Sequence, residues 1–311
     1  MAEMPRDMAR SRWERGRLFW EAPLARFLQS RSGALPDLSG PLGESGLVSP
    51  DSVSWRVFKN PIGLFVGGVS AVLLELAEPR VRSGVWDFTT FRTDPMARMQ
   101  RTGAAAMLTV YGARSMAEKR IAGVRRMHEG VVGETPDGVA YRANDPHLLN
   151  WVHATAAFGF LEAYDQFVAP LTGEERDRYW AEGKTAAGLY GADNPPASQK
   201  AWEVRLAEML PELEPSPIIF EFLDILEAAP ILPRFLSSFQ KTLIRAAVTI
   251  TPQVVRERLK LEDFAELTAR ERRWLRWSGR GSDRVFLASS PPAQACQRMG
   301  LPLNYLYRPA R

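Results

Sequence analysis

Apolar residues recur along most of the chain at the spacing of amphipathic helices, and the alternation typical of strands is scarce. Asp94-Pro95, Asp145-Pro146 and Thr251-Pro252 each place a capping residue before a proline, which the first helical position tolerates. The stretches from Thr172 to Glu175 and from Thr268 to Glu271 match the capping box. This pattern predicts an all-α fold of about 10 to 12 helices.

The best strand pattern runs from Gly138 to Ala143, after a turn at Thr135 to Gly138, and predicts at most a small β-hairpin. Glycine, serine and proline gather at residues 32–50, and glycine and serine at residues 278–283, so both stretches are predicted to be loops. The predicted division is an N-terminal helix and loop extension (1–54), one helical domain (55–290) and a C-terminal extension (291–311).

The 311 residues are 45% hydrophobic and 24% charged, which is ordinary for a folded domain. The net charge of +4 is spread along the chain. Its densest basic runs lie in the N-terminal segment and between Arg270 and Arg284. Neither run is strong enough to indicate a nucleic-acid partner.

The single cysteine, Cys296, excludes a disulfide within the chain, and the N-terminus lacks the apolar stretch of a secretory signal. The longest apolar run, Ile62 to Leu74, is well short of the about 20 residues that a membrane-spanning helix needs. A cytoplasmic location is therefore predicted. The N-terminal segment fits an ordinary packed helix, or an amphipathic one that contacts a membrane surface or a partner.

The sequence lacks the motifs of several classes of enzyme. No glycine-rich dinucleotide or phosphate loop follows a strand, and no Gly-x-Ser-x-Gly nucleophile motif is present. Three histidines and one cysteine nearly exclude a site built from several such ligands, and no pair of Glu-x-x-His elements indicates a di-iron bundle.

The three histidines all fall within 26 residues of the chain. His128 follows Ala117, Ile121 and Val124 at helical spacing, on the apolar face of a helix predicted from Arg114 to Gly130. By this pattern alone, a hydrogen-bonded core histidine is a commoner outcome than a metal ligand. His153 lies on the apolar face of the next helix, and His147 lies in that helix's first turn, exposed or capping.

The helix after Asp94-Pro95 carries a polar stripe. Arg98, Arg101 and Thr102 stand at positions i, i+3 and i+4, so they share one face. Such a stripe is typical of a solvated face with salt bridges, or of the polar wall of a binding site.

Residues 67–167 contain several short elements that resemble a known family. They include GGVSAVLLELAEPRVRSGVWDFTTFRTDPMARMQRT and VRRMHEGVVGETPDGVAYRANDPHLLNWVHATAAFG. These short elements, in this order, resemble the catalytic domain shared by the latex-clearing rubber oxygenases and the fungal MpaB-type oxygenases. The resemblance implies a globin-like, orthogonal arrangement of helices enclosing one heme b.

In the resembling family the iron-binding histidine falls on His128, and the polar residues on the oxygen-binding side fall on Arg98, Arg101 and Thr102. Arg98 is also a candidate partner of the heme propionates. Rubber oxygenases carry a lysine where this chain has Arg101, and its amine occupies the sixth iron position in closed forms. Arginine has no lone pair to donate, so that position is expected to be open or held by another group. His153 is the second candidate for contact with the cofactor.

The resemblance implies a heme-b-dependent oxygenase that uses dioxygen on a small apolar, isoprenoid-like substrate. Three rival interpretations are a peroxidase-like oxidative tailoring enzyme, a non-catalytic carrier of heme or another ligand, and a helical interaction module that binds no cofactor. A fold does not decide among them, because different functions share one fold.

Overall fold

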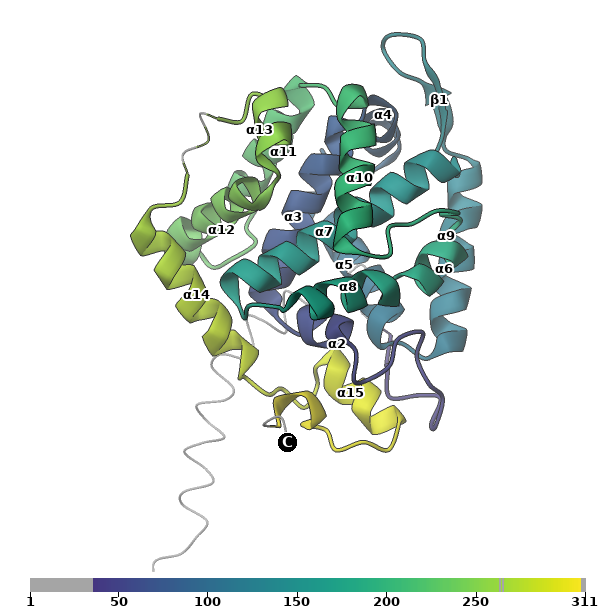
Figure 1. The fold of residues 1–311 in the computed structure, drawn as a ribbon, viewed down its shortest axis with the longest axis vertical. Coiled ribbons are helices and arrows are strands. Elements are labelled where there is room, and N and C mark those ends of the chain that lie inside the picture. Colours follow the sequence, from purple (N-terminus) through teal and green to yellow (C-terminus); the bar gives the residue numbers. More distant parts are fainter. Residues whose placement is uncertain (1–35, 263, 265, 309–311) are drawn as a thin grey trace, which may run out of the picture.

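A computed structural model describes residues 36–308 except 263 and 265, and this part of the chain is mostly helical, which confirms the all-α prediction. The globin-like arrangement and the enclosed heme stay predictions. In chain order (Figure 1), the elements are α2 (Val53–Phe58), α3 (Pro61–Ala77), α4 (Pro79–Phe88), α5 (Pro95–Tyr111), α6 (Arg114–Glu129), β1 (Val132–Glu134), β2 (Ala140–Arg142), α7 (Pro146–Phe167), α8 (Gly173–Glu182), α9 (Lys184–Tyr190), α10 (Gln199–Met209), η1 (Leu210–Glu212), α11 (Pro217–Ala228), η2 (Arg234–Leu236), α12 (Ser237–Ile250), α13 (Gln253–Arg258), α14 (Ala269–Asp283), α15 (Pro291–Arg298) and η3 (Tyr305–Tyr307).

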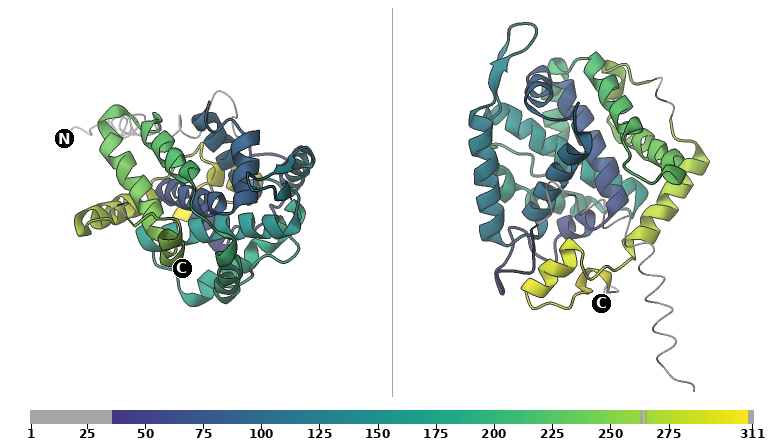
Figure 2. Two further views of the ribbon diagram at one scale, coloured as in Figure 1. Left: turned by 90° about the horizontal axis from the view of Figure 1, so that it is seen from above. Right: turned by 180° about the vertical axis from the view of Figure 1, so that it is seen from behind.

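Helices α3 and α7 cross at the centre of the molecule, and the other helices surround them (Figures 1 and 2). A Cβ atom built on Gly67 would lie 2.6 Å from the backbone oxygen of Gly159, and one built on Gly159 would lie 2.3 Å from that of Gly67. Only glycine at both positions allows this approach. The crossing fixes the relative positions of Glu75, two turns after Gly67, and Thr155, one turn before Gly159.

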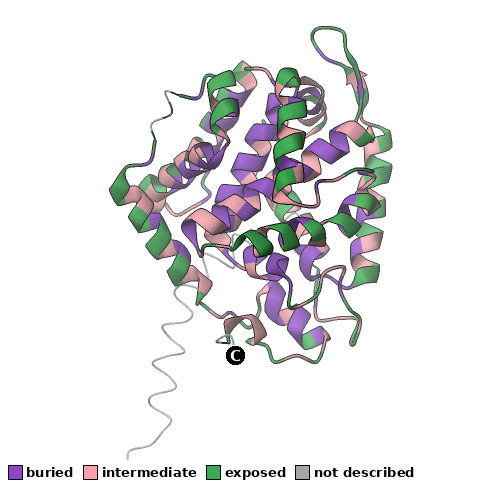
Figure 3. Cartoon of the chain, in the orientation of Figure 1, coloured by how far each residue is buried: buried purple, intermediate pink, exposed green. Residues whose placement is uncertain are grey.

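The core gathers around these two helices. Leu73, Leu74 and Leu76 of α3 and Trp151 of α7 are fully buried, and the Trp151 indole donates a hydrogen bond to the Leu74 oxygen at 3.2 Å. Figure 3 shows buried positions along both central helices and exposed positions along the outer faces of α6, α8 and α14. This distribution follows the apolar patterning, because each outer helix turns one face to the core.

The predicted hairpin is confirmed. Strands β1 and β2 pair antiparallel with Gly133 opposite Tyr141, and Gly138 takes the positive φ of 78° that its turn requires. The hairpin projects from the molecule between α6 and α7 (Figure 1). It carries the chain from the end of α6, where His128 lies, to the start of α7.

Four of the five predicted helix starts are confirmed. Asp94 and Asp145 cap α5 and α7, and both predicted capping boxes are present at α8 and α14. Thr251 is not the cap of α13, which begins after Pro252 without a side-chain cap. Its hydroxyl instead donates to the Ala247 oxygen at 3.0 Å, because Thr251 is buried at the end of α12.

The prediction of a loop at residues 278–283 is wrong, since these residues form the last turns of α14. A Cβ on Gly279 would lie 2.2 Å from the Phe167 oxygen, so this glycine serves close packing against the end of α7. The buried Asn60 amide donates to the Gly279 oxygen at 2.9 Å and to Asp283 Oδ1 at 3.3 Å. Tertiary contacts therefore hold a helix that its glycines alone would disfavour.

The division into extensions and a central domain stays a prediction, and the N-terminal helix falls mostly outside the described residues. On the C-terminal side, Arg298 is buried and donates to the backbone oxygens of Leu38 at 2.7 Å and Tyr111 at 2.8 Å. No single described helix is long and apolar enough to cross a membrane, and the pair α3 and α4 meets that test only jointly, across a bend of 111°. The predicted cytoplasmic location is not tested.

Candidate functional site

Glu75 is the only acid of α3, and it lies among fully buried leucines. Burial raises the pKa of its carboxyl to about 7, against the opposing effects of the Arg98 charge and the Thr155 side chain. Thr155 comes from α7 and Arg98 from α5, so three helices meet at this carboxyl. An acid of this kind is half-ionised near neutral pH.

Arg98 lies in the second turn of α5, which starts at the Asp94 cap. Burial lowers the pKa of its guanidinium, the nearby Glu75 carboxylate raises it, and the Arg101 charge lowers it. The guanidinium donates to the Thr102 hydroxyl, one turn on, and that hydroxyl donates to the Arg98 backbone oxygen at 3.1 Å. Arg98 is therefore a desolvated cation that Thr102 holds in place near the Glu75 carboxyl.

Arg101 and Thr102 lie further from the acid. Arg101 donates from Nη2 to the Thr90 hydroxyl at 2.8 Å, in the loop between α4 and α5. Thr102 is exposed and its hydroxyl is engaged with Arg98. Within the predicted stripe, Arg98 is thus the member beside Glu75, Thr102 bonds to Arg98, and Arg101 bonds to the loop before α5.

His128 lies in the last turn of α6 and is half-buried. Burial lowers the pKa of its imidazole and the Arg98 charge lowers it further, while the Asn144 side chain raises it. The ring is therefore neutral at neutral pH. Its Nδ1 atom is buried and has no hydrogen-bond partner within the described residues.

Asn144, in the loop before α7, lies beside His128. Its amide nitrogen donates to the Arg125 oxygen at 3.0 Å, which holds the amide, while its Oδ1 atom is buried and also lacks a partner among the described residues. The Asn144 side chain raises the pKa of His128, so the two groups lie close to each other. A hydrogen bond from Nδ1–H of His128 to Oδ1 of Asn144 would satisfy both atoms and fix the tautomer that leaves the Nε2 lone pair free.

The other two histidines are placed elsewhere. The His153 ring packs on Gly183 between α8 and α9, where a Cβ would lie 3.1 Å from its Cε1 atom. Burial lowers the pKa of His153 to about 4, and its Nε2 atom has no partner in the described structure. His147 is partly exposed and pairs with Glu212 at 3.2 Å. Neither ring interacts with Glu75 or Arg98.

The donor set fits a porphyrin-held iron. No group of three histidine, cysteine, aspartate or glutamate side chains gathers into a metal site among the described residues. A heme needs only one protein ligand, and His128 offers a neutral imidazole. The Arg98 charge acts on His128, whereas only burial shifts the pKa of His153. The roles assigned to these residues from the sequence stay predictions.

Two residues of this group are not among those that the sequence singled out. Glu75 has a signal that points to it, since it is an isolated acid in an apolar helix, and such a charge is rarely buried without a role. Asn144 has none, because an asparagine before Asp-Pro is typical of a turn. Only the loop geometry after the hairpin shows that it reaches His128.

Comparison with known proteins gives one match. The family described as "ER-bound oxygenase mpaB/B'/Rubber oxygenase, catalytic domain" matches residues 55–283. No curated protein and no solved structure matches the chain. The matched range includes every residue of the candidate site.

Proposed function

Because the chain belongs to the family of mpaB and rubber oxygenase catalytic domains, we propose that it is a heme-b-dependent oxygenase acting with dioxygen on a small apolar, isoprenoid-like substrate. The family supports oxygenase activity in general. One observation carries the rest: a neutral imidazole, a desolvated guanidinium and an acid with a pKa of about 7 come together from three separate helices.

His128 Nε2 would hold the iron, with Asn144 as a positioning residue that keeps the proton on Nδ1. Bound there, heme b supplies the binding and activation of dioxygen. Arg98 would supply a fixed positive charge beside the bound oxygen, where negative charge would develop. Thr102 and Arg101 keep that guanidinium and its helix in place.

Glu75 would act as the proton acceptor. A base works best when its pKa lies near the working pH, and burial brings the carboxyl of Glu75 to about 7. A proton taken from the substrate would neutralise the buried carboxylate. Arg98 limits the cost of the charged state before that transfer.

The first test is the absorption spectrum of the purified full chain, with a pyridine hemochrome assay for stoichiometry. We expect a strong Soret band and roughly one heme b per chain. Protein without such a band after expression with added hemin would contradict heme dependence and favour the interaction-module interpretation.

Histidine variants then identify the ligand. His128→Ala is expected to lower heme retention at least tenfold. His147→Ala is the matched control, since this partly exposed histidine pairs with Glu212 and no described interaction joins it to the site, and it should retain heme fully. A full heme complement in His128→Ala would refute the assignment of His128 as the iron ligand. Loss of heme in His153→Ala alone would assign the ligand to His153 of α7.

Labelled dioxygen tests the oxygenase step. With an isoprenoid-like substrate, product should carry the label from dioxygen and Glu75→Gln should lower the rate at least tenfold. Absence of label in every product of the heme-loaded protein would favour the carrier or the peroxidase-like enzyme.

A further inference from the structure

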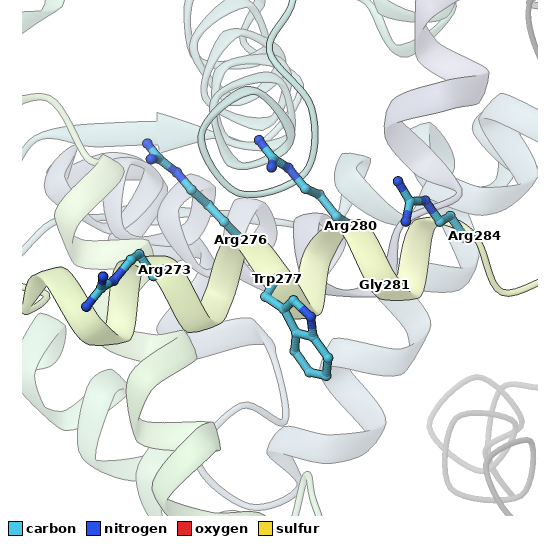
Figure 4. Close-up of a pocket in the computed structure, with 6 residues that line it drawn as sticks. All are labelled: Arg273, Arg276, Trp277, Arg280, Gly281 and Arg284. Atoms are coloured by element: carbon cyan, nitrogen blue, oxygen red, sulfur yellow. The ribbon is translucent and has the colours of Figure 1, made fainter.

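The outer face of α14 carries a row of arginines and two tryptophans. Its members recur at helical spacing and are all exposed: Arg270, Arg273, Trp274, Trp277, Arg280 and Arg284. Trp277 is 73% exposed and Trp274 is 53% exposed. In Figure 4, Arg280 and Arg284 project from one side of the helix together with Arg276, and Trp277 projects from the other.

The acids of α14 do not neutralise this face. Glu271 pairs with Arg245 at 2.6 Å and Asp283 pairs with Lys59 at 3.1 Å, both toward the body of the protein. Within the described ranges, no ion pair involves the arginines of the outer face. The face therefore holds unneutralised positive charge, and its complement is an anionic partner.

Exposed aromatic rings accompany the charge. The Trp274 ring meets Phe239 of α12 edge-on, with centroids 5.2 Å apart, and Phe235, one turn before Phe239, is 83% exposed. Tryptophan beside arginine suits a boundary where one side is apolar and the other carries charged headgroups. A partner that offers charge alone would leave these rings in water.

The shape favours an extended partner. A hollow of about 770 Å³ lies along the helix, but its described lining comes from α14 and Arg284 alone. The 15 residues of α14 form a ridge about 22 Å long. This hollow shares no residue with the site around Glu75 and His128.

We propose that the outer face of α14 docks the protein on a membrane surface containing anionic phospholipids, with the arginines at the phosphates and Trp277 among the headgroups. The N-terminal segment is a poor alternative occupant, because residues 1–35 contain seven arginines against four acids. A basic segment would add to the charge of this face and not neutralise it. The inference is independent of heme binding.

Vesicle binding by the full chain tests it. The probes are phosphatidylcholine vesicles with and without about 30 mol% phosphatidylglycerol, in low salt. We expect at least tenfold tighter partitioning to the anionic vesicles. The variant Arg273→Glu with Arg280→Glu should lose at least tenfold of that binding, because each basic residue near such a surface contributes about fivefold.

The matched control is Lys119→Glu with Arg120→Glu on the exposed face of α6, which changes the net charge equally. It should bind within about twofold of wild type. Trp277→Ala should weaken binding severalfold and remove the part of the tryptophan fluorescence that brominated lipids quench.

Three results would overturn the proposal. Equal binding to neutral and anionic vesicles, or no binding to either, would show that anionic lipids do not attract this face. Full vesicle binding by the α14 double variant assigns the contact to another segment. Tight, salt-sensitive binding of a single-stranded RNA that only the α14 variant loses, without vesicle binding, makes the face a nucleic-acid surface.

Discussion

Charge is used in opposite ways at the centre of the molecule and on α14. At the centre, Glu75, Arg98 and His128 are few and desolvated, and the Arg98 charge acts on both other groups, so the pKa values of all three are displaced. On the outer face of α14, arginines stand in water without acidic partners among the described residues. Burial therefore decides whether a charge tunes chemistry at short range or attracts a partner at long range.

Two glycines of α14 distinguish its packed face from its exposed face. Gly279→Ala would place a Cβ 2.2 Å from the Phe167 oxygen and should destabilise the protein by about 3 kcal/mol or more. A Cβ added at Gly281 would meet nothing within 4 Å, so Gly281→Ala should be neutral or stabilise by up to about 1 kcal/mol. Denaturant unfolding measures both, and equal effects would refute the packing of this helix.

At the centre, Glu75→Gln should change how stability depends on pH. The folded-state pKa is raised from 4.5 to about 7, so the stability linked to its proton is full below pH 4.5 and lost as the pH rises to about 7. Without cofactor, the free energy of unfolding of Glu75→Gln should not fall over this pH range. Above pH 7 the variant should be more stable than the wild type by up to about 3 kcal/mol. Parallel unfolding curves for wild type and variant at pH 5 and pH 8 would show that Glu75 is not desolvated.

Arg98→Met tests whether the three central charges act on one another. Removing the guanidinium should raise the pKa of Glu75 above about 7 and raise the pKa of His128 toward its ordinary value, since Arg98 lowers both. Arg98→Lys keeps the charge and serves as the control. Nuclear magnetic resonance titration of the His128 ring reports the shift, and an unchanged pKa in Arg98→Met would separate the two residues.

The smallest effect is expected on the surface. Arg273→Glu with Arg280→Glu should change the free energy of unfolding by less than about 0.5 kcal/mol per site, because these exposed side chains form no ion pair with described residues. Thermal unfolding in vesicle-free buffer measures it. A large loss would mean that the face already packs on something within the chain.

The sequence predicts local structure well where the signals are local. Asp94, Asp145 and both capping boxes start the helices they indicate, and the turn before Gly138 makes the hairpin. It fails at residues 278–283, where glycines and serines are typical of a loop. There Asn60 and Phe167, more than a hundred residues away, hold the helix.

The order of short elements over residues 67–167 was sufficient to indicate the family, and the helix face of His128 and the stripe from Arg98 to Thr102 follow from spacing alone. The pKa of about 7 at Glu75, the position of Asn144 beside His128 and the packing of His153 on Gly183 come only from the tertiary structure. Helical periodicity shows which residues share a face of one helix. The desolvation of a side chain depends on which helix faces pack together. Here the close crossing of α3 and α7 at Gly67 and Gly159 sets that packing.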